Sequence, residues 1–318
     1  MLDNDESLMH KSCQLLKHVD APLIRFIRGK WGLTQKQIEG ETGVKIIFPS
    51  AKGDNSIVIE GSSVENVNKA SEKITNVLEQ AVKSPNLDYS HFISLPLGIH
   101  PELVEKLQNF QKSVLNEVNM IPGDMDGSSA MGIDRSIFPK PQTLHLTVLM
   151  LKLWNKDRVT TAAKILKEIS LKVMDALENR PVSVRLSGLA CMKGSPAKAQ
   201  VVYAPIEEVG GDERLLRACQ VIIDAYVEAG LVLQKDARQS LKLHATLMNV
   251  RHRKRNMRTE RVDSFDARGI FKKYGKEDWG EYVIPEAHLS ERFLYDESGY
   301  YHCCCSIPFP VASKFSGF

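Results

Sequence analysis

Apolar residues in the first 83 positions recur at two spacings, and each spacing predicts a type of element. Between residues 64 and 81 they recur every three or four positions, as in a helix, and either of the serines just before can cap its start. Two short apolar runs, "VKIIFPS" and "SIVIEG", predict strands joined by a turn. Upstream, "LIRFIRG" and "LTQKQIEGETG" predict short helices on either side of a glycine loop. These residues therefore predict a small unit of mixed helices and strands.

The rest of the chain predicts a larger unit in which similar elements occur twice. The polar segment 84–90, "SPNLDYS", contains a proline and is the predicted linker between residues 1–83 and 91–318. From residue 91 onward, a strand and a helix precede each of two histidine-containing strands, "TLHLTVLM" and "KLHATLMN". The pattern predicts an α+β fold with two similar lobes in this unit.

Two expectations concern particular segments of the second unit. Helical spacing predicts one continuous helix over about residues 156–178. His288, in "AHLSERF", is expected in a connecting loop or surface turn, although its neighbours also fit a strand.

Composition and charge narrow the function classes. No apolar run reaches membrane-spanning length and the acidic start "MLDNDES" is no secretory signal, so we expect a protein inside the cell. The 6 cysteines include no Cys-x-x-Cys pair, so we expect no disulfide framework and no metal site. A zinc site built from His302 and residues 303–305 is disfavoured because it lacks the usual ligand spacing. The basic run "RHRKRNMRTER" predicts a solvated loop, a nuclear address or a phosphate-attracting flank.

The two histidine-containing strands share the pattern His-x-Thr. Residues i and i+2 of a strand point to the same face, so each histidine shares a face with its threonine. The predicted faces comprise His145, Thr147 and Leu149 on the first strand, and Lys242, His244, Thr246 and Met248 on the second. A single such pattern carries little information because threonine is common in strands. Two of them in equivalent positions predict a groove floored by two imidazoles and two hydroxyls.

Such a groove suits phosphodiester cleavage without metal. One neutral imidazole can take a proton from the attacking oxygen while a protonated one gives a proton to the leaving oxygen. The threonine hydroxyls can donate hydrogen bonds to non-bridging phosphate oxygens. Lys242 could add positive charge beside the phosphate.

The motif pair "HLTV" and "HATL" resembles the two-histidine phosphoesterase family, which includes the RNA ligase-like cyclic phosphodiesterases. The resemblance covers about residue 91 to the C-terminus and implies two pseudo-symmetric lobes around a central groove. It implies metal-independent action on RNA ends, cyclic phosphates or small nucleotides. By motif position it implies His145 and His244 as the acid–base pair and Thr147 and Thr246 as phosphate binders. It does not decide which histidine is the acid.

The loop "RGKWG" supplies a second nucleic-acid feature, made of Arg28, Gly29, Lys30, Trp31 and Gly32. Glycines allow close approach of the backbone to a ligand, and the following helix would direct its free amides at a phosphate. With its flanking elements the loop resembles a KH domain, whose Gly-x-x-Gly loop clamps a short single strand. The resemblance implies a first strand near "CQLLKHVDA", where the apolar alternation is poor. Trp31 has two interpretations: it stacks on a base, or it packs against the domain.

A KH-like unit followed by a two-histidine phosphoesterase unit resembles a family of nuclear coactivator-complex subunits, through "GKWGLTQKQIE", "KLHATLMN" and "HLSERF". That resemblance implies a protein of a multi-subunit complex that is nuclear, with a cytoplasmic pool left open. It also implies links to transcription coactivation and to the repair of DNA alkylation damage.

The leading interpretation is an RNA-binding, metal-independent phosphodiesterase without a cofactor, in which Lys242 and Arg292 contact substrate. The alternative is a non-catalytic RNA- or nucleotide-binding adaptor subunit, because binding and cleavage need the same residue types. A metal-dependent nuclease is disfavoured because no carboxylate cluster accompanies the histidines. The expected partners are single-stranded nucleic acid, RNA in particular, and the other subunits of a complex, with no membrane.

Overall fold

The chain forms two compact units. The computed structural model describes residues 12–16, 19, 21–49, 56–119, 132–237, 240–253 and 264–311. One unit comprises residues 1–90 and 152–161, and the other comprises residues 91–151 and 162–318. Among the described helices, none combines the length and apolarity that crossing a bilayer requires.

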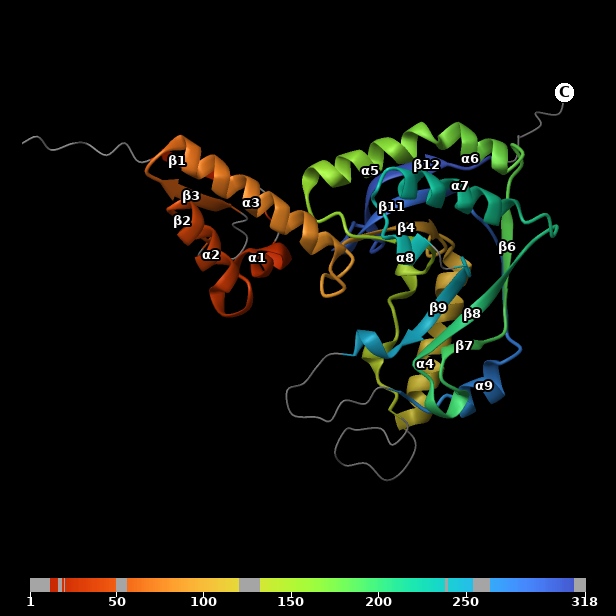
Figure 1. Ribbon diagram of the computed structural model, residues 1–318. Coiled ribbons are helices and arrows are strands. Elements are labelled where there is room, and N and C mark those ends of the chain that lie inside the picture. The colour runs from red at the N-terminus through yellow and green to blue at the C-terminus, as the bar shows by residue number, and fades with distance from the viewer. Residues whose placement is uncertain are drawn as a thin grey trace, which may run out of the picture. The chain divides into compact units, whose positions relative to one another are not determined.

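The first unit places helices against a small antiparallel sheet with strand order β1-β3-β2 (Figure 1). Its elements are β1 (Ser12–Leu16), α1 (Ala21–Arg28), α2 (Leu33–Thr42), β2 (Val44–Ile47), β3 (Ile57–Gly61) and α3 (Val64–Lys83). Alternate residues of β2 and β3 and one face of α3 are buried in a common apolar core. The side chain of Ser63 caps α3 by accepting a hydrogen bond from the amide of Asn66.

The expected first strand is present as β1, although none of its residues is fully buried. Its backbone pairs with β3 over five residues, from Ser12 opposite Gly61 to Leu16 opposite Ile57. An edge strand held mainly by backbone hydrogen bonds has little need of an apolar face, which explains the poor alternation in its sequence.

Residues 152–161 belong to the first unit, although the linker predicted at residues 84–90 had assigned them to the second unit. Trp154 packs against the apolar core of the first unit, and its Nε1 donates a hydrogen bond to the Asp88 carbonyl at 2.6 Å. The backbone amide of Leu153 donates to the Ser90 hydroxyl at 2.9 Å. The single helix predicted over 156–178 is divided into two helices at Ile169, where ψ is −1°, although backbone hydrogen bonds continue through this residue.

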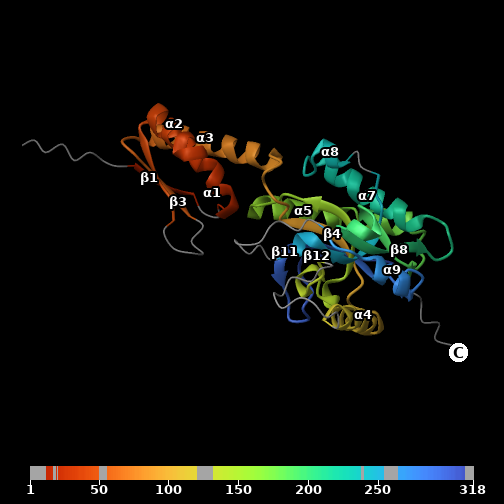
Figure 2. The same cartoon turned by 90° about the horizontal axis from the view of Figure 1, so that it is seen from below.

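In the second unit, nine of the described strands form one sheet with the order β10-β6-β8-β9-β5-β4-β11-β12, and β7 pairs with β8. Helices α5, α6 and α7 lie together, and α4 lies apart from them (Figures 1 and 2). The elements are β4 (His91–Pro96), α4 (Pro101–Asn119), β5 (His145–Leu151), α5 (Lys156–Glu168), α6 (Ser170–Ala176), β6 (Ser183–Ser187), β7 (Ala190–Lys193), β8 (Val201–Glu208), α7 (Arg214–Glu228), α8 (Gln234–Ala237), β9 (His244–Asn249), α9 (Arg268–Tyr274), β10 (Asp278–Val283), β11 (Glu286–Tyr295) and β12 (Tyr301–Pro308). The first residues of α5, up to residue 161, belong to the first unit.

The predicted internal repeat corresponds to two strand–helix–strand segments, β4-α4-β5 and β8-α7-β9. In each segment a proline of the first strand lies opposite the histidine of the last. Pro96 pairs with His145, and Pro205 pairs with His244. The last strands of the two segments, β5 and β9, are antiparallel neighbours at the centre of the sheet. The repeat therefore brings the two His-x-Thr patterns together.

His288 lies within β11 and is buried, so its expected place in a loop is wrong. It pairs with Ser94 of β4 and Ser306 of β12, and its ring packs edge-on against Tyr300 at 5.8 Å. Its packing inside the unit, including the contact with Tyr300, leaves this imidazole little exposed, whereas a surface turn would have exposed it to solvent.

Candidate active site

The two His-x-Thr patterns meet on one face of the sheet. Leu146 of β5 lies directly opposite Ala245 of β9. Because the strands are antiparallel, the residue before Leu146 lies opposite the residue after Ala245, and the reverse. His145 is therefore opposite Thr246, and Thr147 is opposite His244. All four side chains are partly exposed, whereas Leu146 and Ala245 between them are fully buried on the other face. Each imidazole therefore has its own threonine beside it along the strand and the other threonine across the strand pair.

Both histidine strands contain a β-bulge immediately after the threonine. In β5, Leu149 pairs with Ile93 of β4 and Thr147 pairs with the next residue, Ser94. Val148, between them, has no partner and is the extra residue of the bulge. In β9, Met248 and Thr246 pair with consecutive residues of β8, so Leu247 is the extra residue. An extra residue shifts the alternation of side chains by one position. The predicted placement of Leu149 and Met248 on the histidine face is therefore wrong: both are buried, and Met150 and Asn249 take that face instead.

The same backbone contact holds each imidazole. Nδ1 of His145 lies 2.8 Å from the Thr143 carbonyl, and Nδ1 of His244 lies 2.7 Å from the Lys242 carbonyl. Because a carbonyl only accepts, Nδ1 carries the hydrogen and Nε2 of the neutral ring is left with a lone pair. At His145 this lone pair lies 3.1 Å from the Thr147 hydroxyl, which donates to it. Both rings are thus fixed in the tautomer that a general base needs.

Burial keeps both imidazoles neutral near pH 7. Burial, together with the nearby charges of His244 and His252, lowers the pKa of His145 to about 4, although the hydrogen bond to Thr143 opposes the shift. Burial also lowers the pKa of His244, and the ammonium of Lys242 acts in the same direction. Each ring can therefore accept a proton, and an anion bound between them would favour the charged form.

A cleft of about 210 Å³ opens above this face. Its lining includes three of the four motif residues, His145, Thr147 and Thr246, together with Arg292, one of the predicted substrate contacts. His244 is not among the residues that line it. The guanidinium of Arg292 stacks on Phe293 at 4.5 Å, and its charge contributes to a lowered pKa of His252. The cleft thus combines hydroxyl, imidazole and guanidinium groups, which are the donors that bind phosphate.

Several residues of the cleft were not predicted from the sequence. His252 lies in a 3-10 turn at the start of the basic run that was interpreted as a loop, and its own position gave no signal. Tyr301 packs edge-on against the His145 ring at 5.4 Å, and Phe92 packs at 4.8 Å from the same ring. These aromatic rings account for much of the burial around His145. Residues 254–261 of the basic run lie outside the described residues.

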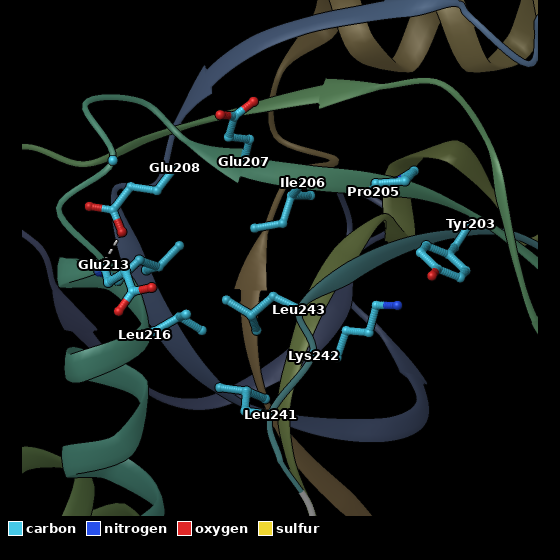
Figure 3. Close-up of a pocket in the computed structure, with 12 residues that line it drawn as sticks. Tyr203, Pro205, Ile206, Glu207, Glu208, Glu213, Leu216, Leu241, Lys242 and Leu243 are labelled. Carbon is cyan, nitrogen blue, oxygen red and sulfur yellow. Dashed lines mark hydrogen bonds between the residues drawn. The ribbon is translucent and has the colours of Figure 1, made fainter.

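Lys242 lines a second hollow, of about 380 Å³, and does not line the cleft (Figure 3). Its ammonium lies 5.5 Å from the centre of the Tyr203 ring, and that ring in turn packs against His244 at 5.1 Å. The walls of this hollow also carry Glu207 and Glu213 (Figure 3). Lys242 therefore acts on His244 through its charge and does not contact the cleft.

The glycine loop of the first unit has a strained backbone. Gly29, Trp31 and Gly32 have φ values of 70°, 58° and 75°, all in the left-handed region that favours glycine. A Cβ on Gly29 would lie 2.2 Å from the Thr34 hydroxyl, so only glycine fits there. The helix that follows, α2, has no side-chain cap at its start. The amide of Leu33, its first residue, donates to the Lys30 carbonyl, and the amides that follow in the first turn can face a ligand.

Trp31 is 83% exposed, so its packing interpretation is wrong. A left-handed backbone at a non-glycine residue costs energy that the loop must offset elsewhere. Lys30 beside it is also exposed, and Arg28 stacks on Phe48 at 4.6 Å. The loop therefore presents an aromatic face and positive charge to solvent together, as single-strand binding requires.

Comparisons with known proteins place both units in families. Residues 89–309 match the AKAP7 2'5' RNA ligase-like domain, and residues 15–76 match the KH domain. The chain is 30% identical to activating signal cointegrator 1 complex subunit 1 of Mus musculus over 92% of this chain and 83% of the mouse protein. It is 21% identical to human A-kinase anchor protein 7 isoform gamma over 74% of this chain and 61% of that protein.

A solved structure, that of TT0787 from Thermus thermophilus, aligns with 70% of this chain and 98% of its own at 18% identity and a TM-score of 0.43. The similarity to the mouse subunit spans both units, and the 2'5' RNA ligase-like match alone covers more than half of the chain. The chain therefore belongs to the AKAP7 2'5' RNA ligase-like family, with a KH domain in front of the family's domain.

Proposed function

We propose that this chain holds single-stranded RNA with its KH domain and hydrolyses a phosphodiester or a cyclic phosphate in the cleft, without metal. The observation that carries the proposal is that His145 and His244 lie on two adjacent central strands, each across from the other strand's threonine and each with Nδ1 bound to a backbone carbonyl. Two imidazoles beside one anion site can serve as base and acid in a single displacement.

In this mechanism His145 is the general base and His244 is the general acid. The pKa of His145 is held at about 4, so this ring is neutral at pH 7 and can accept a proton. His244 is less enclosed, and a bound phosphate raises the pKa of a nearby imidazole through its negative charge. Nε2 of His145 takes the proton of the attacking oxygen as the new P–O bond forms. Protonated His244 gives its proton to the leaving oxygen as the old P–O bond breaks.

The threonines hold the non-bridging oxygens in this mechanism. In the free protein the Thr147 hydroxyl donates to His145 at 3.1 Å. A phosphate oxygen can take over that hydrogen bond, which frees the Nε2 lone pair for catalysis. Thr246 is placed for the same role from the other strand, and Arg292 in the cleft wall adds charge to the bound anion.

The KH domain supplies binding that does not depend on the reaction. Exposed Trp31 can stack on a base, and the uncapped start of α2 can accept a backbone phosphate. The mouse relative is named as a subunit of a complex, so we also propose assembly with other subunits and a nuclear location with a role in coactivation and alkylation repair. A fluorescent fusion of the full chain, followed in cells, tests the location.

The decisive experiment measures hydrolysis of short RNAs and of RNAs with 2',3'-cyclic phosphate ends in excess chelator. We expect turnover by the unaltered chain and its loss in His145→Ala and His244→Ala. His100→Ala is the matched control, since Nε2 of His100 lies 2.9 Å from the Val283 carbonyl and outside the cleft. Turnover that survives both the His145→Ala and the His244→Ala substitution contradicts the mechanism. Tight RNA binding with no turnover under any condition supports instead the adaptor function.

A further inference from the structure

A second group of reactive side chains lies apart from the cleft. Among the described residues, His91, Glu291 and Cys304 are the only three histidine, cysteine or acidic residues whose ligand atoms all lie within 4.8 Å of one another. They come from three adjacent strands, β4, β11 and β12. One nitrogen, one oxygen and one sulfur donor therefore converge on a single point of the sheet.

The strand register explains the convergence. Glu291 pairs directly with His91, so their side chains are cross-strand neighbours on one face. On the other side of β11, Ser290 pairs with Cys303 and Leu289 pairs with Cys305, which leaves Cys304 as the extra residue of a β-bulge. Bulges re-aim a side chain, and this one directs Cys304 toward the pair formed by His91 and Glu291.

The group lies on the face of β4 opposite to the cleft. Phe92 lines the cleft, and the preceding residue of a strand points to the other face. His91 is buried, while Glu291 and Cys304 are half-buried, so the point where they meet is shielded and still reachable from solvent. A site at this point is separate from the residues of the proposed reaction.

We propose that His91, Glu291 and Cys304 bind a divalent transition-metal ion, and that the ion is Zn²⁺. Imidazole, carboxylate and thiolate are the three zinc ligands that proteins use, at ~2.0–2.3 Å from the ion. A separation within 4.8 Å lets the three donors close on one ion with small side-chain movements. Binding releases the thiol proton of Cys304 to solvent, and a water molecule occupies the fourth tetrahedral position.

Sequence spacing could not reveal this set. Its members lie on three strands that are distant in the chain, and the zinc site considered from the sequence, with His302 and the contiguous cysteines, shares only Cys304 with it. His302 is exposed on β12, and neither Cys303 nor Cys305 belongs to the group.

Cobalt substitution and metal analysis of the full chain test the proposal. We expect one equivalent of Zn²⁺ to bind to the metal-free protein. Co²⁺ should give the near-ultraviolet absorption of a thiolate–cobalt bond. Cys304→Ser should abolish that band and weaken Zn²⁺ binding by about 100-fold or more, since even outer-sphere changes cost ~10–100-fold. His91→Ala and Glu291→Gln should weaken it in the same direction.

The neighbouring cysteine provides the matched control. Cys303→Ser changes the adjacent residue of the same strand and should leave both the absorption band and Zn²⁺ affinity within a few-fold of the unaltered chain. Less than one equivalent of bound Zn²⁺, or equal binding by the Cys304→Ser and Cys303→Ser variants, overturns the proposal. These readouts do not involve turnover, so they stand or fall independently of the RNA reaction.

Discussion

The two His-x-Thr strands share a backbone arrangement and differ in the surroundings of their histidines. In both, a proline of the neighbouring strand faces the histidine, Nδ1 binds a carbonyl two residues upstream, and a bulge follows the threonine. Phe92 and Tyr301 enclose His145, whereas Lys242 and Tyr203 flank His244. The fold thus fixes the same tautomer in both histidines, while the neighbouring side chains set the pKa of each imidazole separately. A duplicated scaffold can in this way produce an acid and a base from identical motifs.

The largest expected effect separates these two roles. His145→Ala and His244→Ala should each lower turnover by ~10²–10⁴-fold, the usual contribution of a general acid or base. A substrate with a nitrophenolate leaving group needs no proton at that oxygen. His244→Ala should therefore recover most of its rate on this substrate, and His145→Ala should not. Recovery by His145→Ala alone would reverse the assignment.

The threonines come next, and they test whether the two strands bind the phosphate equally. Thr147→Val and Thr246→Val remove one hydrogen-bond donor each at nearly constant volume. We expect each to lower turnover by roughly 10–10²-fold, somewhat below the loss of a fully buried oxyanion donor. The comparison of kcat and KM for the two variants is the measurement. A threonine whose removal changes neither quantity does not contact the phosphate.

The third prediction contrasts the two units. Trp31→Ala should weaken binding of single-stranded RNA by roughly 5–100-fold, because base stacking contributes ~1–3 kcal/mol. Hydrolysis of a small cyclic nucleotide should stay unchanged, since that substrate needs only the cleft. Trp31→Phe retains a ring and serves as the control. Unchanged RNA affinity in Trp31→Ala would exclude this side chain as a stacking platform.

A pH titration of stability measures the enclosure of His145. Its pKa is about 4 in the folded chain and ~6.5 when unfolded, so the unfolded state binds more protons between these values. The free energy of unfolding should therefore fall as pH drops from 6.5 to 4, with a contribution from His145 on the order of 2 kcal/mol. In His145→Gln this part of the pH dependence should disappear. A variant with the same slope as the unaltered chain would show that the ring is solvated.

The smallest effect concerns salt. Each phosphate contact by a lysine contributes about 0.7 to the slope of log affinity against log salt for a single strand. Lys30→Gln should therefore reduce the slope by about that amount. Lys242 lines the second hollow and not the cleft, so Lys242→Gln should reduce the slope less. Equal slopes for Lys30→Gln and the unaltered chain would assign the phosphate contacts to other residues.

Local periodicity accounts for what could be predicted of the fold. The spacing of apolar residues revealed α3, α4 and α7, because each buries one face against a core. It missed the division into two helices at Ile169, across which the apolar spacing continues. It also left β1 in doubt, since backbone pairing with β3 leaves almost no trace in side-chain polarity.

The part of the candidate site that could be predicted was the part that the repeated His-x-Thr pattern marks in the sequence. Two copies of His-x-Thr indicated His145 and His244, and the structure pairs their strands. The bulges at Val148 and Leu247 were not predictable, because a bulge depends on the register of the partner strand. His252 was hidden for a similar reason: it reaches the cleft through chain contacts that its own neighbours in sequence do not indicate.

The twin bulges also give the cleft a direction. They turn Met150 inward from one strand and Asn249 inward from the other, at matching positions. A thioether therefore borders one end of the anion site and a carboxamide borders the other. The two substituents of a phosphodiester therefore meet unequal neighbours, so a substrate that enters in the reverse direction is held less well.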